Sequence, residues 1–488
     1  MLRTFCWLAA CLFSISLVGR GVGQEATPPN IVFILADDLS WADLGCYGHP
    51  YHDTPHIDTL ASQGVRFTNG YAPAPICSAS RASFLTGKTT ARLNFEFVTK
   101  EKPGRQASVG KALQTPPFTL NLPLEEVTLA ERLGQLGYKT AMFGKWHLNA
   151  HHKRYLGWSP VFGPLKQGFD VAVEDFGSHP YSWGKREIEK ISEVGVFPED
   201  SMVDRAINFI KQDHNRPFFL VTSQFYVHTP VKTPCTWLVD KYEKRLSPDS
   251  VSRERRVRYA AFVEELDNRV GRILDAIESS GHQNDTLIVF TSDNGGHPEF
   301  SANGPLRGSK WNLYEGGVRV PMVVRLPGGK HAGKQCETPV IGYDLLPTFV
   351  DFAGGELPQV DGLSLAPLLR AEMLGDENTL DAMDRHLLWH FPYYHPERTY
   401  SSALEVIGIN DFAVSKTKPH SALRMGKYKL LHFYESDRTE LYDLEADPSE
   451  QRDISSDQPS KTMELSRRLF SALHESNARL PVPNRGEP

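Results

Sequence analysis

The sequence predicts an α/β fold: a large, mixed, mostly parallel sheet flanked by helices, followed by a smaller C-terminal α+β domain that contains an antiparallel sheet. Apolar, β-branched runs alternate with amphipathic helical patterns over most of the chain, and this alternation is typical of parallel sheets. Several of these runs end in polar residues, as strands at a functional sheet edge do. Beyond about residue 375 the pattern changes to short strands and a terminal helix.

The clearest predicted strand covers residues 30–36 (NIVFILA), a continuous apolar run that ends at Asp37-Asp38. A helix is predicted over 54–64, because a threonine cap, a proline at the first helical position and a final glycine frame it. The other extended segments predicted before residue 375 are 65–67, 139–148, 217–226, 286–291 and 318–326. Helices are also predicted at 122–137 and 344–354. A third, long helix ends at Gly281, and its apolar face consists of Tyr259, Phe262, Leu266, Val270, Ile273 and Ile277.

The middle of the chain, 150–203, is rich in glycine, proline and tryptophan and only weakly periodic. We expect long surface loops there, of the kind that shape substrate pockets in enzymes. In the C-terminal part, strands are predicted at 386–391 and within 423–433, and a helix at 461–473. The acidic tract 445–460 is predicted to be a solvated loop.

A chain of 488 residues suits one large domain and one smaller domain. The formal charge of −6 gives no overall basic surface and argues against nucleic acid as a partner, although local cations can still bind an anionic substrate. Arg3 and the apolar run 5–18 are typical of a secretory signal, and no later run is long enough to span a membrane. We therefore expect a secreted or periplasmic protein with a signal peptide at 1–23, a catalytic domain at 24–375 and a smaller domain at 376–488.

Four cysteines remain once the signal is removed: Cys46, Cys77, Cys235 and Cys336. Their wide spacing indicates neither a disulfide framework nor a zinc site. If Cys77 is committed to chemistry, at least one of the other three stays unpaired, and which of them pair is left open.

The segment CSASRASFLTGK places Cys77 at or just before the start of a short helix that ends near Gly87. Arg81 lies one turn further on and would share a face with Cys77. A cysteine beside an arginine at a helix N-terminus is a reactive arrangement. The alternative is a buried structural cysteine, which is the commoner role for a cysteine taken alone.

Polar residues follow two of the predicted strands. Asp37 and Asp38 end the first, and Asp293 and Asn294 follow the run 286–291. Either pair alone could simply cap a turn. Because the carboxyl ends of parallel strands meet at one edge of a sheet, the two pairs together favour a site for a hard cation such as Ca²⁺ or Mg²⁺.

A second set of residues is cationic. Lys145 and His147 are two apart in a predicted strand and would point to one face. His228 follows another strand, and Lys310 precedes a glycine-rich segment. Individually each could be an ordinary surface or core residue. With Arg81, they form a set able to bind a compact dianion and to move protons.

These residues resemble those of the type I sulfatase family, and the N-terminal region is especially similar to arylsulfatases. The motifs that carry the resemblance lie between Asn30 and Pro321: NIVFILADDLSWADLGCYGHP, CSASRASFLTGK, LPLEEVTLAERLGQLGYKTAMFGKWHL, TSDNGG and LRGSKWNLYEGGVRVP. The resemblance implies calcium-dependent hydrolysis of sulfate esters. It also implies that Cys77 is oxidised to Cα-formylglycine, whose hydrated aldehyde attacks sulfur and then expels the sulfate.

The resemblance assigns a role to each residue of the two sets. The implied calcium ligands are Asp37, Asp38, Asp293, Asn294 and the modified Cys77. Among the implied catalytic residues, Arg81 steadies the formylglycine, Lys145 and Lys310 bind sulfate oxygens, His147 helps remove the proton that triggers release, and His228 is the general acid.

Ala79 departs from the commonest pattern, which has proline two residues after the cysteine. Alanine there resembles the variant that anaerobic, radical-type maturation enzymes process, so the formylglycine-generating partner is left open. Two other functions are left open as well: a phosphonate or phosphate ester hydrolase on the same site, and a glycan-binding protein in which Cys77 is never converted.

The expected substrates are sulfated carbohydrates, with aryl sulfates as surrogates. The segments 150–203 and 393–420 are expected to select the sugar. Arg154, Lys166 and His395 are conceivable contacts to a polyanionic chain, and for each the alternative is a solvated surface position.

Overall fold

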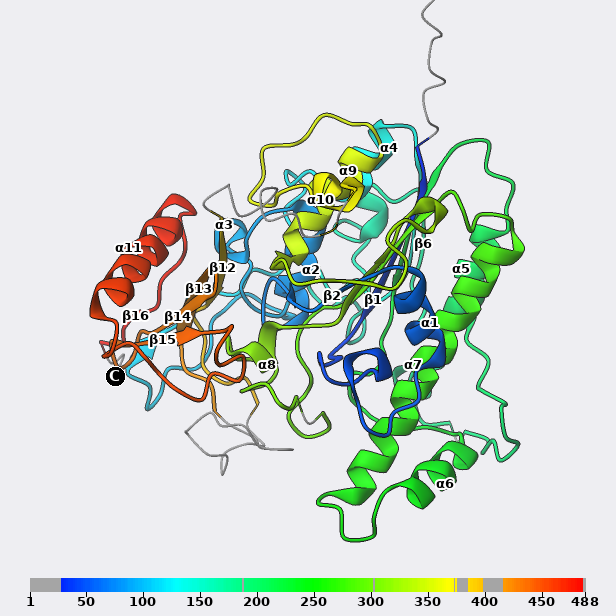
Figure 1. Ribbon diagram of the computed structural model, residues 1–488, viewed down its shortest axis with the longest axis horizontal. Helices are drawn as coiled ribbons and strands as arrows, with labels where there is room; N and C mark the ends of the chain where they lie inside the picture. Colours follow the sequence, from blue (N-terminus) through cyan, green and yellow to red (C-terminus); the bar gives the residue numbers. More distant parts are fainter. Residues whose placement is uncertain are drawn as a thin grey trace, which may run out of the picture.

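The computed structural model describes residues 28–186, 188–301, 303–372, 374, 385–397 and 416–485. Its larger part is built on an eight-stranded sheet with the order β10-β2-β9-β8-β1-β7-β5-β6 (Figure 1). In that order, the strands are Lys334–Cys336, Val65–Phe67, Met322–Arg325, Thr286–Ser292, Asn30–Ala36, Phe218–Ser223, Lys139–Gly144 and Val171–Val173. The block from β8 to β6 is parallel, and β9 is antiparallel to both β8 and β2. The sheet is therefore mixed and mostly parallel, as predicted.

Helices cover both faces of this sheet, which explains why its central strands are apolar throughout. All seven residues of β1 are buried, and its side chains alternate between two separate cores. The helices on one face are α2 (Cys77–Thr86), α4 (Leu129–Gln135), α9 (Leu345–Phe352) and α10 (Ala366–Arg370). Those on the other face are α1 (Pro55–Gln63), α5 (Ser201–Ile210) and the long α7 (Arg253–Ser279).

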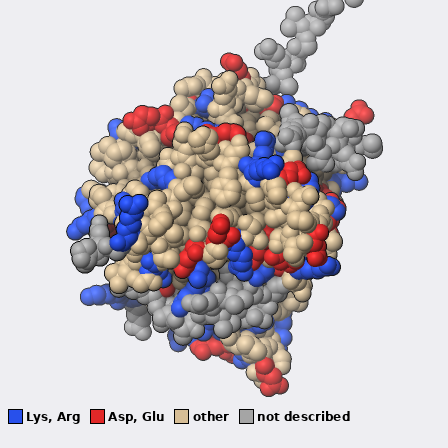
Figure 2. Space-filling model, turned by 90° about the vertical axis from the view of Figure 1, so that its left-hand side faces the viewer, with Lys and Arg blue, Asp and Glu red and all other residues tan. Residues whose placement is uncertain are grey.

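The C-terminal part is a separate four-stranded antiparallel sheet, at the left of Figure 1. Its strands are β12 (His386–Phe391), β13 (His420–Met425), β14 (Tyr428–Phe433) and β15 (Arg438–Asp443). Helix α11 (Pro459–Glu475) packs on it through Leu465, Leu469 and Leu473. On the face that Figure 2 shows, Lys and Arg side chains are interspersed with Asp and Glu, as on an ordinary solvated surface.

Short elements complete the fold. The remaining helices are α3 (Thr90–Leu93), α6 (Thr236–Arg245) and α8 (Glu315–Val318), and the small two-stranded sheets pair β3 (Gly70–Tyr71) with β11 (Val340–Ile341) and β4 (Leu113–Gln114) with β16 (Val482–Pro483). Among the described helices, none is long and apolar enough to cross a membrane. The four cysteines of the described chain, Cys46, Cys77, Cys235 and Cys336, are free thiols.

Some predictions concern residues outside the described ranges. The signal peptide at 1–23, the domain boundary near 375 and most of the segment 393–420 lie there. The predicted strand at 139–148 is wrong in its second half, since β5 ends at Gly144. Gly144 has φ 105°, and a Cβ there would lie 1.9 Å from the carbonyl oxygen of Ser223. A glycine is thus required where the chain leaves the sheet.

Other predicted elements need smaller corrections. The segment 423–433 is two strands, β13 and β14, joined by a tight turn at Gly426. The segment 318–326 holds the end of α8 and then β9, and 150–203 contains the edge strand β6 as well as loops. The tract 445–460 is not wholly solvated, because Glu450 is completely buried and forms an ion pair with Lys429. Helix α6 was not predicted.

Candidate active site

Helix α2 begins at Cys77, and the whole helix is buried. The chain before it folds back against its first turn, because Ser80 Oγ accepts a hydrogen bond from Ala74 N–H at 3.0 Å and donates one to the Ala74 carbonyl at 2.9 Å. The residue at the cap position, Ile76, has an extended backbone and makes no side-chain cap hydrogen bond. The helix ends at Gly87 with φ 68°, as predicted. Cys77 is held at a fixed point beside the carboxyl ends of the strands.

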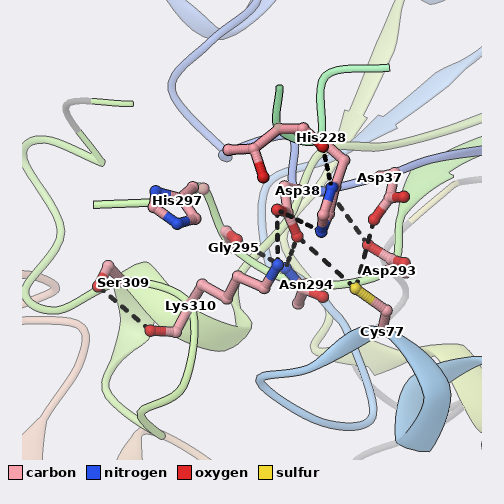
Figure 3. Close-up of polar contacts among 12 residues, drawn as sticks. Asp37, Asp38, Cys77, His228, Asp293, Asn294, Gly295, His297, Ser309 and Lys310 are labelled. Carbon is pink, nitrogen blue, oxygen red and sulfur yellow. Dashed lines mark hydrogen bonds and ion pairs between the residues drawn. The ribbon is translucent and has the colours of Figure 1, made fainter. Parts of the chain in front are cut away.

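The acidic residues lie together at the ends of β1 and β8, which are neighbouring parallel strands. The thiol Sγ of Cys77 is 3.3 Å from Asp37 Oδ1 and 3.8 Å from Asp38 Oδ1 (Figure 3). The backbone N–H of Asp38 donates to Asp293 Oδ1 at 3.1 Å, and Asn294 Nδ2 donates to Asp38 Oδ1 at 2.8 Å. The structure thus brings together all five residues that the sequence predicted as metal ligands.

These residues also fit a cation chemically. Asn294 Oδ1 is buried and has no hydrogen-bond partner among the described residues, although a buried carbonyl oxygen normally has one. Ligand atoms of Asp37, Asp38, Cys77 and His228 lie within 4.8 Å of one another. Ca²⁺ prefers oxygen ligands, which the carboxylates of Asp37 and Asp38 and the amide of Asn294 offer. The unpartnered amide oxygen is the observation that a purely structural acidic cluster would not explain.

Three cations neutralise the carboxylates. Arg81 binds Asp293 Oδ2 through Nε at 2.9 Å and Nη2 at 2.7 Å, Lys145 Nζ is 2.5 Å from Asp37 Oδ2, and Lys310 Nζ is 2.6 Å from Asp38 Oδ2. All of these side chains are almost completely buried. Buried charges require such partners because desolvation is otherwise too costly. The predicted cationic set therefore also converges on this point.

The charges set the protonation of the carboxylates. Burial raises the pKa of Asp38, but the opposing charge of Lys310 is the largest of the contributions that outweigh burial and hold that pKa well below its usual value. Burial and the neighbouring Asp37 raise the pKa of Asp293 to about 6 despite the contact with Arg81. Asp38 is thus firmly ionised, while Asp293 takes up a proton more readily than an ordinary carboxylate.

Both predicted histidines are neutral at pH 7. Burial and the charge of Lys310 lower the pKa of His228 to about 3, and burial with Lys145 holds the pKa of His147 well below its usual value. His228 Nε2 faces Asp38 Oδ2 at 3.7 Å. Its Nδ1 is 2.7 Å from the Thr229 carbonyl, which can only accept, so the proton lies on Nδ1.

His147 lies beyond the end of β5 and not on the strand, so its position was predicted for the wrong reason. It adopts a left-handed backbone with φ 56°, and Asp38 does so with φ 63°. Such conformations are uncommon for residues with a side chain and gather at functional sites. The Nδ1 atom of His147 is buried without a hydrogen-bond partner among the described residues.

The thiol of Cys77 is not activated as a thiolate. Burial, with the negative charges of Asp293 and Asp37, raises its pKa well above the usual value, and Lys145 and Lys310 offset this only in part. The reactive arrangement expected from a helix N-terminus and an arginine is therefore overridden by two carboxylates and by desolvation. The encoded side chain at this position is a neutral thiol.

Sequence reasoning missed several residues of the site. Tyr181 OH lies 3.0 Å from His228 Nδ1, and His179 Nε2 lies 3.0 Å from the His228 carbonyl oxygen. His297 lies on the other side of Lys310 (Figure 3), and its pKa falls to about 3 through burial and the charge of Lys310. The position of His297 directly after the Ser-Asp-Asn-Gly-Gly motif could have identified it from the sequence. Tyr181 lies in a short 3₁₀ helix, Pro180–Ser182, within a part of the sequence that has no clear periodicity.

The structure places the three conceivable substrate contacts, His395, Arg154 and Lys166, in different surroundings. The ring of His395 lies 4.8 Å from the ring of Trp311, next to Lys310 in the chain. Arg154 forms an ion pair with Glu174. Lys166 is exposed in a short helical turn. Of the three, His395 is the one whose described contacts connect it to the site.

The fold and the site together describe an α/β enzyme that gathers carboxylates, an amide oxygen and cations around one buried cysteine, an arrangement suited to hydrolysing an anionic ester. Comparison with known families agrees: the sulfatase family model matches residues 29–355, and the model for the C-terminal region of N-sulphoglucosamine sulphohydrolase matches 309–407 and 409–479. The chain belongs to the sulfatase family and is a sulfuric ester hydrolase.

Individual relatives cover most of the chain. Human arylsulfatase A is 33% identical over 87% of this chain and 83% of its own. Dog N-acetylgalactosamine-6-sulfatase is 32% identical over 75% of this chain and 70% of its own. Among solved structures, Ps i-CgsB in complex with k-i-k-neocarrahexaose matches with a TM-score of 0.69, at 26% identity, over 92% of this chain and 93% of its own.

Proposed function

We propose that this enzyme hydrolyses sulfate esters of carbohydrates in a calcium-dependent reaction, through a formylglycine made from Cys77. The observation that carries the proposal is the convergence on one thiol of Asp37, Asp38, Lys145 and Lys310. Neither a structural cysteine nor a thiolate nucleophile accounts for this setting, because two carboxylates beside a thiol suppress its ionisation. A modified, uncharged side chain that works next to a metal ion does account for it.

Asp37, Asp38, Asp293, Asn294 and the modified Cys77 would hold the calcium ion. When bound, the ion supplies positive charge that acidifies the hydrated aldehyde and neutralises sulfate oxygens. The protein's own cations have a second role in this scheme. Lys145 and Lys310 pair with Asp37 and Asp38 in the structure, and a divalent ion on those carboxylates leaves both ammonium groups able to bind the sulfate.

The other site residues position and move protons. Arg81 donates to the carbonyl oxygen of Lys145 and to Asp293, so it fixes the strand ends around the modified residue. His228 is the proposed general acid, because its Nε2 faces the centre of the site while its Nδ1 is held by the Thr229 carbonyl. His147, with its unpartnered Nδ1, is the proposed base for sulfate release.

Sulfated carbohydrate is the proposed substrate class. The names of two relatives, an N-acetylgalactosamine-6-sulfatase and a protein solved with a neocarrahexaose, support it. The proposed maturation partner is an anaerobic, radical-type enzyme, inferred from Ala79. The proposed location is outside the cytoplasm, with 1–23 as signal peptide and 24–375 as catalytic domain.

The decisive experiment uses the enzyme purified from its native host. We expect turnover of aryl sulfates to exceed turnover of the matching aryl phosphates and phosphonates, and mass spectrometry of the Cys77 peptide to show the aldehyde. Dominant phosphate or phosphonate turnover would replace the sulfatase proposal by that activity. An intact thiol together with glycan binding would indicate a protein that never matures.

Removal of calcium tests the metal separately. Dialysis against a calcium chelator is expected to abolish turnover and to lower the melting temperature, since a ligand present at about 100 times its Kd stabilises by about 2.7 kcal/mol. Added Ca²⁺ is expected to restore both. Asn294→Ala removes one neutral proposed ligand, so this variant should require a higher calcium concentration to reach the same activity. Unchanged activity and melting temperature in the chelator would contradict a calcium site.

A further inference from the structure

A loop between α3 and β4 brings an additional cation to the edge of the site. The backbone N–H of Thr99 donates to Ser78 Oγ at 3.3 Å, and Ser78 is the neighbour of Cys77 in α2. Lys100 follows directly and is partly buried. This loop carries none of the motifs that define the catalytic centre, so Lys100 has no role in the reaction described above.

The ammonium group of Lys100 is held by aromatic rings. Its Nζ lies 5.2 Å from the ring centroid of Phe97 and 5.7 Å from that of Phe118, and these rings stack on each other at 5.3 Å. Burial lowers the pKa of Lys100, and no other cause contributes to that shift. Phe97 is buried, so the aromatic support is rigid. The cation–π contacts hold a partly dehydrated charge in a defined place.

Lys100 differs in one respect from the two buried lysines of the site. Lys145 and Lys310 each lie within 3.0 Å of a carboxylate oxygen. Within the described ranges, no carboxylate lies within ion-pairing distance of Lys100. A partly buried ammonium without an anion is costly, and binding of an anion from solution would relieve that cost.

His151 connects Lys100 to the catalytic centre. The charges of both Lys100 and Lys145 lower the pKa of His151, after burial, so this imidazole lies within electrostatic reach of both lysines. Its ring packs 4.8 Å from the half-exposed Tyr155 and 5.8 Å from His147. Its Nε2 is buried and has no hydrogen-bond partner among the described residues. The opposing charge nearby is Glu101, which is exposed.

We propose that Lys100, together with His151, forms a subsite for a second anionic group of the substrate, a sulfate or carboxylate on the same sugar or the next one. The subsite rests on the proposed sulfatase function and narrows its substrate class to polyanionic sugars. The sulfate to be cleaved lies at Cys77 between Lys145 and Lys310, and the second anion lies at the rim. Because Lys100 is partly buried, its attraction for that anion is screened less than at an exposed lysine.

The test compares Lys100→Gln with Lys102→Gln, a matched control at an exposed lysine two positions away. Both variants are assayed on an aryl sulfate and on a panel of sulfated disaccharides with one anionic group or with two. Sugars that are not hydrolysed are assayed as inhibitors of aryl sulfate turnover. For Lys100→Gln we expect kcat/KM or inhibitor affinity to fall about 10- to 100-fold more for the doubly anionic sugars than for the singly anionic ones, mainly through KM.

Two further measurements sharpen the result. In a Cys77→Ala background, which binds without cleaving, calorimetry should show the same selective loss of affinity for doubly anionic sugars. Glu101→Gln removes the opposing charge and should strengthen their binding. An equal effect of Lys100→Gln on all substrates, no effect, or no binding of any doubly anionic sugar would overturn the subsite. Absence of aryl sulfate turnover in the parent enzyme would instead overturn the proposed function.

Discussion

The described part of the chain holds two buried clusters of lysine and carboxylate, and only one of them belongs to the active site. At the catalytic centre, Lys145 and Lys310 pair with Asp37 and Asp38. In the second cluster, Lys429 on β14 lies between Glu315 of α8, at 2.8 Å, and Glu450, at 3.0 Å. This structural cluster joins the C-terminal sheet to the larger part of the chain.

The two clusters differ in the chemical groups that lie beside their charges. In the structural cluster, Glu315 also accepts from Tyr71 OH at 2.7 Å, and Glu450 accepts from the backbone N–H of Glu315 at 2.6 Å. At the catalytic centre, a thiol and an imidazole lie beside Asp38, at the carboxyl ends of parallel strands. Buried charge alone therefore does not identify a catalytic site. A thiol and an imidazole beside that charge do.

The largest expected effect is on activity at the catalytic centre. Cys77→Ala removes the residue proposed to become the nucleophile, and we expect turnover of aryl sulfate to fall by about 10⁵-fold or more. The melting temperature should change little, because the four other proposed metal ligands remain. The readouts are a kinetic assay and thermal unfolding of the same preparation. Near-normal turnover in this variant would refute the assignment of Cys77.

The next effect concerns stability at the structural cluster. Lys429→Met leaves the buried Glu450 without a cation and leaves Glu315 with only the longer ion pair to Arg319, at 3.5 Å. It should cost about 3–5 kcal/mol of unfolding free energy. Burial and Glu315 raise the pKa of Glu450 to about 7 although Lys429 opposes this, so protonation already relieves part of the repulsion. A raised folded pKa gives stability that is lost as pH rises, so the defect should be larger at pH 8 than at pH 5.

Denaturant unfolding at both pH values measures this effect. Lys427→Met is the matched control, because it breaks only a surface pair with Asp443 and should leave the unfolding midpoint nearly unchanged. Equal midpoints for the Lys429→Met variant and the parent would show that the cluster does not hold the two parts of the chain together. The assignment of a structural role to this cluster, in contrast to the catalytic one, would then be wrong.

The smallest expected effect is on proton transfer to the leaving group, and its size depends on the substrate. His228→Gln removes the proposed general acid and should lower kcat/KM about 10²- to 10⁴-fold for a sugar sulfate, whose leaving alkoxide needs a proton. The loss should be much smaller for 4-nitrophenyl sulfate, whose leaving group is stable as an anion. The parent needs protonated His228, whose pKa is lowered to about 3, so its kcat/KM on the sugar sulfate should fall as pH rises.

The variant should lose that pH dependence. Kinetics between pH 4 and pH 8 with both substrates would show it. An equal loss on both substrates would assign His228 to binding and not to proton transfer.

The sequence was sufficient for the features that depend on local pattern. The apolar run of β1 and the cysteine, arginine and glycine of α2 predicted those elements, and polar residues at the strand ends predicted the site. The predictions from the sequence were wrong where tertiary contacts determine the local structure or the burial of a residue. Gly144 ends β5 because the neighbouring strand leaves no room for a side chain, and Glu450 is buried because Lys429 of another strand binds it. Neither partner is visible in the local sequence.

Residues of the site that lie in loops were the hardest to predict. Tyr181 reaches His228 from a single turn of 3₁₀ helix, Pro180–Ser182, and its role appears only when the strands around it are assembled. Lys100 is one of many lysines in the sequence, and its position over two aromatic rings depends on the folding of a loop. Such residues carry specificity more often than catalysis, since loops vary while the scaffold keeps the reacting groups in place.

The complete burial of helix α2 has a consequence for how the enzyme is made. Cys77 is 1% exposed and Ala79 is not exposed at all, so a second protein cannot reach this segment once the chain has folded. An enzyme that performs the proposed conversion of Cys77 to formylglycine would therefore have to act before the chain folds. Under that proposal, folding and oxidation of Cys77 compete in time, and a molecule that folds first keeps an unmodified thiol. The yield of active enzyme in a given host would then be decided during synthesis, before the stability of the finished protein matters.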